Sequence, residues 1–295
     1  MADAGAPLDP PAAVRRIIGR LEREGYEAWC VGGAVRDALL GHPHLDWDIA
    51  TSATPNQVRQ LFRRSIPVGI EFGTVGVLDD AGVMHEVTTF RRDVRTDGRH
   101  AEVEFGVSLD DDLARRDFTI NAIAYSPTRD EVRDPYGGRE DLARRIVRAV
   151  GIPEARMRED RLRALRGIRF ASRFGFELDR ETWKAIVASG PQLGRLSAER
   201  VKQEIEKTLA QVDCPAAAFA RWREAGAFAS VVPALARVSA DTFRVLDHLP
   251  RPGVKTRPAR LVIRLAGLFA GVPAPTARDA LRALRFSNTD GAAIG

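Results

Sequence analysis

The sequence has 295 residues, of which 44% are hydrophobic and 29% are charged, which is typical of a folded globular protein and excludes a disordered one. Two cysteines, Cys30 and Cys214, exclude a disulfide framework or a cysteine metal site, and they favour a reducing compartment. No apolar run approaches the ~20 residues of a membrane span, and the first 11 residues lack a signal-peptide core, so we expect a cytoplasmic protein. The net charge of +5 comes mostly from Arg, which suits phosphate recognition but also fits a genome-wide bias toward Arg over Lys.

The first expected elements are a helix, a strand and a second helix. Residues 11–25 carry apolar side chains at helical spacing, and the apolar run 26–31 predicts a buried strand. Gly32 and Gly33 follow, and residues 34–40 have a helical composition that ends at Gly41. Glycines let the backbone approach a ligand where N–H groups converge at a helix start, which favours a nucleotide triphosphate. A Gly-Gly turn taken alone is common, and the alternative is an ordinary turn.

Two carboxylates follow this turn on a predicted strand. Residues 45–49 alternate with a period of two, so Leu45, Trp47 and Ile49 are expected to face the core and Asp46 and Asp48 the opposite side. Such a pair offers the hard oxygen ligands that Mg²⁺ prefers. Two ions about 3.5–4 Å apart activate a hydroxyl and stabilise leaving pyrophosphate. The alternative is a solvated strand face.

The next strands are expected at 75–78 and 86–90. Glu86 begins the second of them, beside residues 73–75, and is a candidate third catalytic carboxylate; the alternative is a charge on an edge strand. Residues 91–100 are polar, Arg-rich and without periodicity, so they predict a mobile loop, with a plain solvated loop as the alternative.

The Arg-Arg-Asp sequence at 115–117 is a second candidate binding motif. Paired guanidiniums can hold phosphates, Asp117 can accept from a ribose hydroxyl, and Asn121 can orient either group. A basic pair taken alone is more often a solvated face. Beyond a turn-rich hinge at 134–138, the composition becomes that of an all-helical region from residue 143.

A third motif lies at 159–163. We expect these residues to share one helix, on which Asp160 and Arg163 face the same way and offer an acceptor and donors to one base edge, while Glu159 holds Arg163 in plane. Cytosine and adenine match this pattern, whereas guanine and uracil would leave buried polar groups unpaired. The alternative is a surface salt bridge.

These motifs, in this order, resemble those of the class II tRNA nucleotidyltransferase and bacterial poly(A) polymerase family. The resemblance is dense over residues 26–204 and rests on Gly-Gly-Ala-Val-Arg-Asp at 32–37, the Asp-Trp-Asp pair, Arg-Arg-Asp and Glu-Asp-Arg-Leu-Arg. It implies an α+β fold: a nucleotidyltransferase head of the polymerase-beta type with a mixed β-sheet, followed by an all-helical neck and body. It implies catalysis by Asp46, Asp48 and Glu86, with Mg²⁺ as cofactor on the first two. The implied nucleotide-binding residues are Gly32, Gly33, Arg36, Arg116, Asp117, Asn121, Glu159, Asp160, Arg163, Arg166 and Arg169.

The resemblance also gives an expected organisation. Residues 1–25 form an N-terminal extension and leading helix, 26–142 the catalytic head, 143–212 a neck for base recognition, and 213–295 a body for RNA binding that is shorter than the family implies. Residues 91–100 would be a lever for nucleotide choice, and Glu199 and Glu204 would join helices.

The resulting hypothesis is a template-independent RNA nucleotidyltransferase that adds CCA to tRNA 3′ ends. Its partners would be CTP, ATP and the tRNA acceptor arm. Open alternatives are a poly(A) polymerase, a CC-adding or A-adding specialist and, from another class, a catalytically inert RNA-binding relative. Residues 69–75 resemble the corresponding segment of the tRNA nucleotidyltransferases in the family more than that of the poly(A) polymerases. The clustered acids argue against an inert relative, because carboxylates beside RNA phosphates weaken binding. The oligomeric state stays open.

Overall fold

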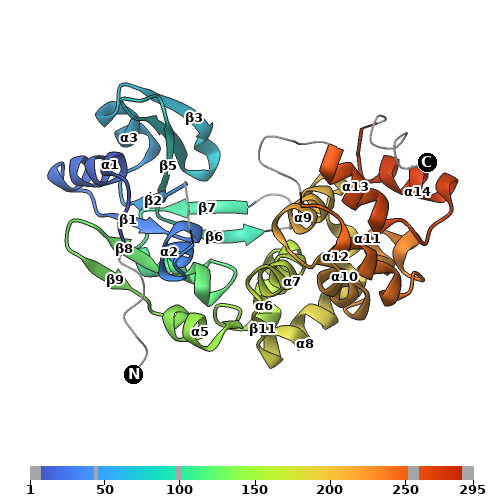
Figure 1. Ribbon diagram of the computed structural model, residues 1–295. Coiled ribbons are helices and arrows are strands. Elements are labelled where there is room, and N and C mark those ends of the chain that lie inside the picture. Colours follow the sequence, from blue (N-terminus) through green and yellow to red (C-terminus); the bar gives the residue numbers. More distant parts are fainter. Residues whose placement is uncertain (1–7, 43–45, 97–100, 252–258, 288–295) are drawn as a thin grey trace. The chain divides into compact units, whose positions relative to one another are not determined.

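The computed structural model describes residues 8–42, 46–96, 101–251 and 259–287. The chain divides into two compact units (Figure 1). The head unit comprises Met1–Thr96, His100–Arg144 and Arg148–Gly151, and the helical unit comprises Asp97–Arg99, Arg145–Val147 and Ile152–Gly295. The finer division into extension, head, neck and body stays a prediction.

A seven-stranded mixed sheet forms the centre of the head unit, as the sequence predicted. Its strands, in spatial order, are β3 (Ser65–Gly69), β4 (Thr74–Leu78), β5 (Met84–Thr89), β2 (Asp48–Thr51), β1 (Ala28–Val31), β8 (Ala124–Ser126) and β9 (Glu131–Arg133). Only the β2–β5 pair is parallel. Because β5 lies between β4 and β2, Glu86 is not on an edge strand, and that alternative is wrong.

The helices of the head unit are α1 (Ala12–Arg23), α2 (Gly33–Leu39), α3 (Pro55–Leu61), α4 (Leu109–Ala114) and α5 (Gly138–Arg144), with short 3₁₀ turns at Ile70–Phe72 and Thr119–Asn121. The leading helix is confirmed, since α1 buries the apolar residues that predicted it. Burial of these apolar side chains against the sheet stabilises the docked helix by about 25 cal/mol for each Å² of apolar surface removed from water.

The core under the sheet fixes where the candidate site can lie. The pairing of β1 with β2 sets Trp29 opposite Ala50 and Val31 opposite Asp48. Trp29, Val31 and Ala50 belong to a buried cluster that also takes in Phe90 and α4. By strand alternation, Asp48 stands on the same face as this cluster, at its end. The acid is therefore held on a packed, rigid platform.

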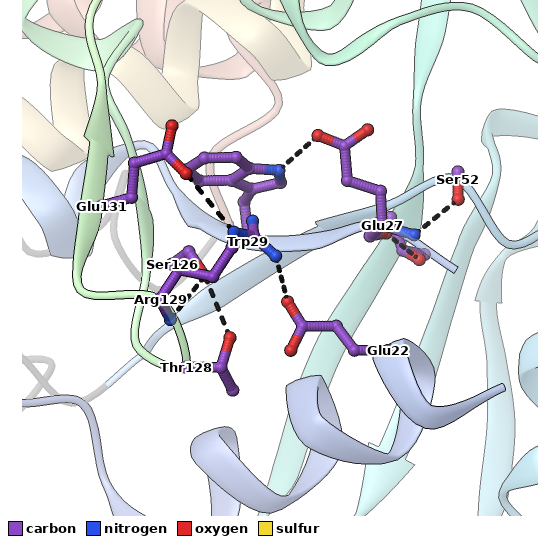
Figure 2. A network of polar contacts seen from close by, with 9 residues as sticks. Glu22, Glu27, Trp29, Ser52, Ser126, Thr128, Arg129 and Glu131 are labelled. Atoms are coloured by element: carbon purple, nitrogen blue, oxygen red, sulfur yellow. Dashed lines mark hydrogen bonds and ion pairs between the residues drawn. The ribbon is translucent and has the colours of Figure 1, made fainter. Parts of the chain in front are cut away.

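A polar network surrounds Trp29, one member of that cluster (Figure 2). The Arg129 guanidinium lies over the Trp29 ring, 4.5 Å from its centroid, and binds Glu22 of α1. The Trp29 indole nitrogen donates to Glu27 at 2.7 Å. A hollow of about 470 Å³ lies beside it, but Arg129 and the other cation on its lining, Arg133, are both paired with carboxylates. The network ties the leading helix to the sheet.

The expectation of a loop at 91–100 is wrong, because most of this segment is a β-hairpin. Strands β6 (Arg91–Thr96) and β7 (Ala101–Phe105) pair with each other in a separate sheet. An ion pair between Arg92 and Glu104, at 2.7 Å, crosses it. Residues 97–100 lie outside the described part.

The helical unit is built almost as predicted. Its α-helices are α6 (Pro153–Glu159), α7 (Leu162–Phe174), α8 (Arg180–Ser189), α9 (Ala198–Gln211), α10 (Pro215–Glu224), α11 (Ala227–Val231), α12 (Val245–His248), α13 (Ala259–Leu268) and α14 (Ala274–Ala283). The exception is a short parallel pair, β10 (Ile146–Val147) with β11 (Glu177–Leu178). Packed rings of Phe219, Trp222, Phe228 and Phe243 form an aromatic core.

Candidate active site

At the turn around Gly32, the Gly-Gly motif lies close to residues of the other motifs of the head unit. Gly32 links β1 to α2 with φ 76°, a left-handed conformation that favours glycine. A Cβ at this position would lie 2.9 Å from Nη1 of Arg116 and 3.8 Å from Oδ2 of Asp48. The backbone conformation therefore favours glycine here, and a Cβ would displace the end of the Arg116 side chain. The first and second motifs meet here.

The carboxylates gather where β2 begins. The strand runs from Asp48 to Thr51, so it begins and ends later than the strand expected at 45–49, and Asp46 lies outside it; Leu45 lies outside the described residues. Asp46 precedes the strand, and both aspartates are exposed. The parallel pairing of Ile49 with Val87 brings Glu86 alongside Asp48. Asp48 and Glu86 thus lie on neighbouring strands, and the charges of Glu86 and Asp46 both act on Asp48. The catalytic roles of the three acids stay predictions.

The electrostatics of Asp48 reflect this crowding. The pKa of Asp48 is raised to about 6, first because surrounding protein atoms reduce the hydration of its carboxylate and then because of the Glu86 charge. Arg116 opposes the shift, and Asp46 adds to it. The side chain still reaches solvent, so its desolvation is partial. A bound cation would relieve the repulsion among these acids.

The donor set fits a divalent cation held by two protein ligands. Among the described residues, no group of three or more His, Cys, Asp and Glu side chains is arranged to hold a metal ion. Mg²⁺, however, is commonly held by one or two carboxylates together with water and substrate phosphates. Asp46 and Asp48 meet that requirement. Glu86 acts here as an electrostatic neighbour of the pair, and its catalytic role stays a prediction.

A buried hydrogen-bond network supports the Arg-Arg-Asp motif. Arg36 is 3% exposed; its guanidinium contacts Asp37 at 2.7 Å and donates to Oδ1 of Asn121 at 2.5 Å. Asn121 donates in turn to Oδ1 of Asp117 at 2.8 Å. The structure therefore gives Arg36 the task of holding Asn121, which differs from the direct nucleotide contact that we expected. Asp117 and Asn121 are brought together as predicted.

The residue that sequence reasoning missed is Asp112 on α4. Its side chain is 1% exposed and accepts from Arg115 Nε at 3.0 Å and Nη2 at 2.8 Å, and from Arg116 Nη2 at 3.0 Å. Burial alone would raise the pKa of Asp112, but the charges of Arg116 and Arg115 make the net shift downward. Its spacing of three and four residues before the two arginines was the available signal.

The third motif, in the helical unit, is arranged differently from the expectation. α6 ends at Glu159, Asp160 is extended, and α7 begins at Leu162, so the motif spans a helix break and not a single helix. Asp160 Oδ1 accepts from the Leu162 N–H at 3.0 Å, and Oδ2 binds Arg200 of α9 at 2.7 Å. Both carboxylate oxygens are thereby oriented.

Glu159 does hold Arg163, as predicted. The Arg163 guanidinium donates to Glu159 Oε2 at 2.8 Å and to the Arg156 carbonyl at 3.3 Å. Arg163 is 8% exposed, so its orientation is well restricted. The roles of Glu159, Asp160 and Arg163 in base recognition stay predictions.

The basic stripe expected beyond this motif is wrong at Arg169. That side chain is 3% exposed and binds Glu204 at 2.5 Å and Gln211 at 3.1 Å, joining α7 to α9. Glu204 thus joins helices, as predicted. Arg166 is half-buried over the Phe170 ring, 5.2 Å from its centroid, and its nucleotide contact stays a prediction.

Comparison with known proteins agrees with this arrangement. A model described as the poly A polymerase head domain matches residues 28–148, and one described as the probable RNA and SrmB-binding site of polymerase A matches residues 175–238. The CCA-adding enzyme of Geobacillus thermodenitrificans is 50% identical over 196 residues, covering 66% of this chain and 48% of that protein. The CCA-adding enzyme of Enterococcus faecalis is 41% identical over 277 residues, covering 92% and 66%.

A solved structure extends the likeness to nearly the whole chain. The crystal structure of the Bacillus stearothermophilus CCA-adding enzyme in complex with CTP has a TM-score of 0.83 and 40% identity, covering 96% of this chain and 68% of that one. Mixed sheet and clustered motifs thus define a nucleotidyltransferase head. The chain belongs to the class II CCA-adding enzyme (tRNA nucleotidyltransferase) family.

Two further facts bound this likeness. The chain spans about half the length of several curated relatives that it matches. Within the described part of the chain, every helix is too short or too polar to cross a membrane.

Proposed function

We propose that the protein adds CCA to the 3′ ends of tRNA, taking CMP and AMP from CTP and ATP and releasing pyrophosphate. The observation that carries the proposal is the close approach at Gly32. Arg116 from the second motif and Asp48 from the carboxylate group lie within 4 Å of one Cβ position. A phosphate-binding cation and metal-binding acids at one turn are what nucleotidyl transfer requires. The relatives named CCA-adding enzymes support the choice of product.

Asp46 and Asp48 are the proposed holders of divalent cations, Mg²⁺ in the first place. Bound there, the ions would lower the pKa of the attacking 3′ hydroxyl and stabilise the charge on the leaving pyrophosphate. The chain's own residues bind and orient: Arg116 contacts the phosphates, and Asp117, held by Asn121, accepts from the ribose. The α-phosphate is then presented in line to the hydroxyl.

Base choice is assigned to the helix break in the helical unit. Asp160 presents an acceptor and Arg163 presents donors, and both are oriented by neighbours, namely Arg200 and Glu159. CTP and ATP each offer an amino donor beside a ring-nitrogen acceptor. GTP and UTP would leave the pair with unmatched polar groups, which costs about 1–3 kcal/mol for each group.

One assay tests the proposal and separates it from its alternatives. Purified protein is given tRNAs that end before the first C, before the second C and before the A, each with one labelled nucleotide at a time. Addition of two C and then one A supports the proposal. A run of A on any end indicates a poly(A) polymerase, and addition stopping after C or confined to A indicates a specialist. No incorporation, with tRNA still bound, would identify the inert RNA-binding relative.

A further inference from the structure

The buried carboxylate of Asp112 serves two arginines at once. Each of its oxygens takes one guanidinium: Oδ1 accepts from Arg115 and Oδ2 from Arg116. The carboxylate is 1% exposed, whereas the two arginine side chains are 18% and 17% exposed. The acid is therefore sealed beneath a pair of cations that a ligand can still reach. A ligand bound here would contact the two arginines, and Asp112 could affect it only by positioning them.

The charges around Asp112 do not cancel, which favours binding of an anion. Two guanidiniums share one carboxylate, and a further pair of opposite charges, Arg91 at the start of β6 with Asp93 beside it, lies close by. Burial, and next the charge of Arg115, lowers the pKa of Arg91 to about 10. Buried Nε atoms of Arg91 and Arg116 have no hydrogen-bond partner in the described part of the protein. These buried atoms are out of reach of a ligand, so an anion would be met by the exposed parts of the Arg115 and Arg116 guanidiniums.

The position of the pair tells where that ligand would lie. Nη1 of Arg116 is 2.9 Å from the Cβ position of Gly32, which in turn is 3.8 Å from Oδ2 of Asp48. Asp112 fixes the Nη2 end of Arg116, whose Nη1 also donates to the Asn121 carbonyl at 3.4 Å. Loss of the Asp112 contact would loosen the Arg116 guanidinium at this turn and loosen Arg115 beside it. A guanidinium misplaced by 1 Å no longer binds two phosphate oxygens together.

We propose that Asp112 is a positioning residue that aims the guanidiniums of Arg115 and Arg116 at the triphosphate of the incoming nucleotide. The inference rests on the proposed function, and it adds a residue that none of the three motifs contains. It predicts that Asp112 acts on the β- and γ-phosphates and leaves the sugar and base unaffected.

The test compares the equilibrium binding of CTP and CMP by wild-type protein and by Asp112→Asn. Because a hydrogen bond between charged groups contributes about 1.5–3 kcal/mol, Asp112→Asn is expected to weaken CTP binding about tenfold or more. CMP binding should change less than about twofold, since CMP lacks the phosphates that the arginines are aimed at. General damage to the fold would weaken both ligands together.

Asp110→Asn is the matched control. It removes the same charge from the same helix and also breaks a carboxylate–arginine pair, Asp110 with Arg133. It should leave the ratio of CTP to CMP affinity at the wild-type value. Two double variants complete the test: Asp112→Asn with Arg116→Met, and Arg115→Met with Arg116→Met. The first should bind CTP no more weakly than the second, because Asp112 acts only through the two arginines.

The outcomes separate the two proposals. A wild-type preference for CTP over CMP that Asp112→Asn leaves intact overturns the role of Asp112 alone. Equal binding of CTP and CMP by the wild-type protein overturns the nucleotide chemistry on which this role rests. If Asp112→Asn does not fold, Asp112→Glu decides, since it keeps the charge but displaces the carboxylate and should still weaken CTP selectively.

Discussion

The two candidate sites, one in each unit, differ in what holds their functional side chains. In the head unit, reactive groups come from distant segments and meet at a glycine turn that excludes a Cβ. In the helical unit, Glu159, Asp160 and Arg163 come from five consecutive positions, and a helix break aims them. The first site depends on tertiary packing and the second on local backbone geometry, so substitutions should damage them in different ways.

The largest expected effect is on the acids of the head unit. Asp48→Ala should lower kcat for both CMP and AMP addition by more than about 10³-fold, because it removes the principal electrostatic element of the reaction. Asp46→Ala should behave alike. The dissociation constant for tRNA, measured by filter binding, should stay within about twofold. Turnover retained at wild-type level in either variant would contradict the metal-binding assignment.

The next effect breaks the packing at the turn. Gly32→Ala should lower kcat/KM about 10²-fold, since the new Cβ would lie 2.9 Å from Arg116 Nη1 in a backbone conformation with φ 76°. Gly33→Ala is the matched control, because its Cβ would lie at an ordinary 3.5 Å from Arg36 Nη2. Steady-state kinetics of both variants decide the matter. Equal losses would mean that the turn needs flexibility in general.

The sequence allowed the central strands β1, β2, β4 and β5, the first two helices and the helical character of the second unit to be predicted, because alternation and helical spacing reflect burial. The head sheet and α1 are examples. It could not show that Arg169 is buried, since an Arg in a basic stripe looks the same whether or not a distant Glu204 pairs with it. The helix break at Asp160 was missed because no Gly or Pro marks it; the Asp160 carboxylate instead accepts from the first N–H of the next helix, that of Leu162. Asp112 was visible as spacing, yet its burial required the fold.

A smaller effect is expected from substitutions at the candidate base-recognition residues of the helical unit. Arg163→Ala should reduce discrimination between the correct and incorrect nucleotides about tenfold, because one lost set of donors accounts for about 1–3 kcal/mol. Glu159→Ala should do the same more weakly, as Glu159 only orients Arg163. The measurement is kcat/KM for all four nucleotides. A lower rate with unchanged selectivity would show that the pair is a structural salt bridge.

The smallest expected effect concerns stability and the pKa of Asp48. The pKa of Asp48 rises from 3.8 to about 6 on folding, so the folded protein binds this proton more tightly than the unfolded chain does. The free energy of unfolding therefore falls as the pH rises between these two values. Asp48→Asn removes that loss. Without divalent ions, its Tm should match wild type near pH 3.5 and exceed it by about 2 °C at pH 7.5. That is the shift given by roughly 1 kcal/mol, discounted because the side chain reaches solvent.

Scanning calorimetry in EDTA across this pH range measures the difference, with Asp110→Asn as the control. The pKa of Asp110 is lowered, first by its hydrogen bond to Arg133, so that variant should lose stability above pH 4. Opposite signs for two Asp→Asn changes in one unit would show that the acids of the site are held at a cost in folding free energy. A stabilised Asp110→Asn, or an Asp48→Asn difference independent of pH, would contradict that account.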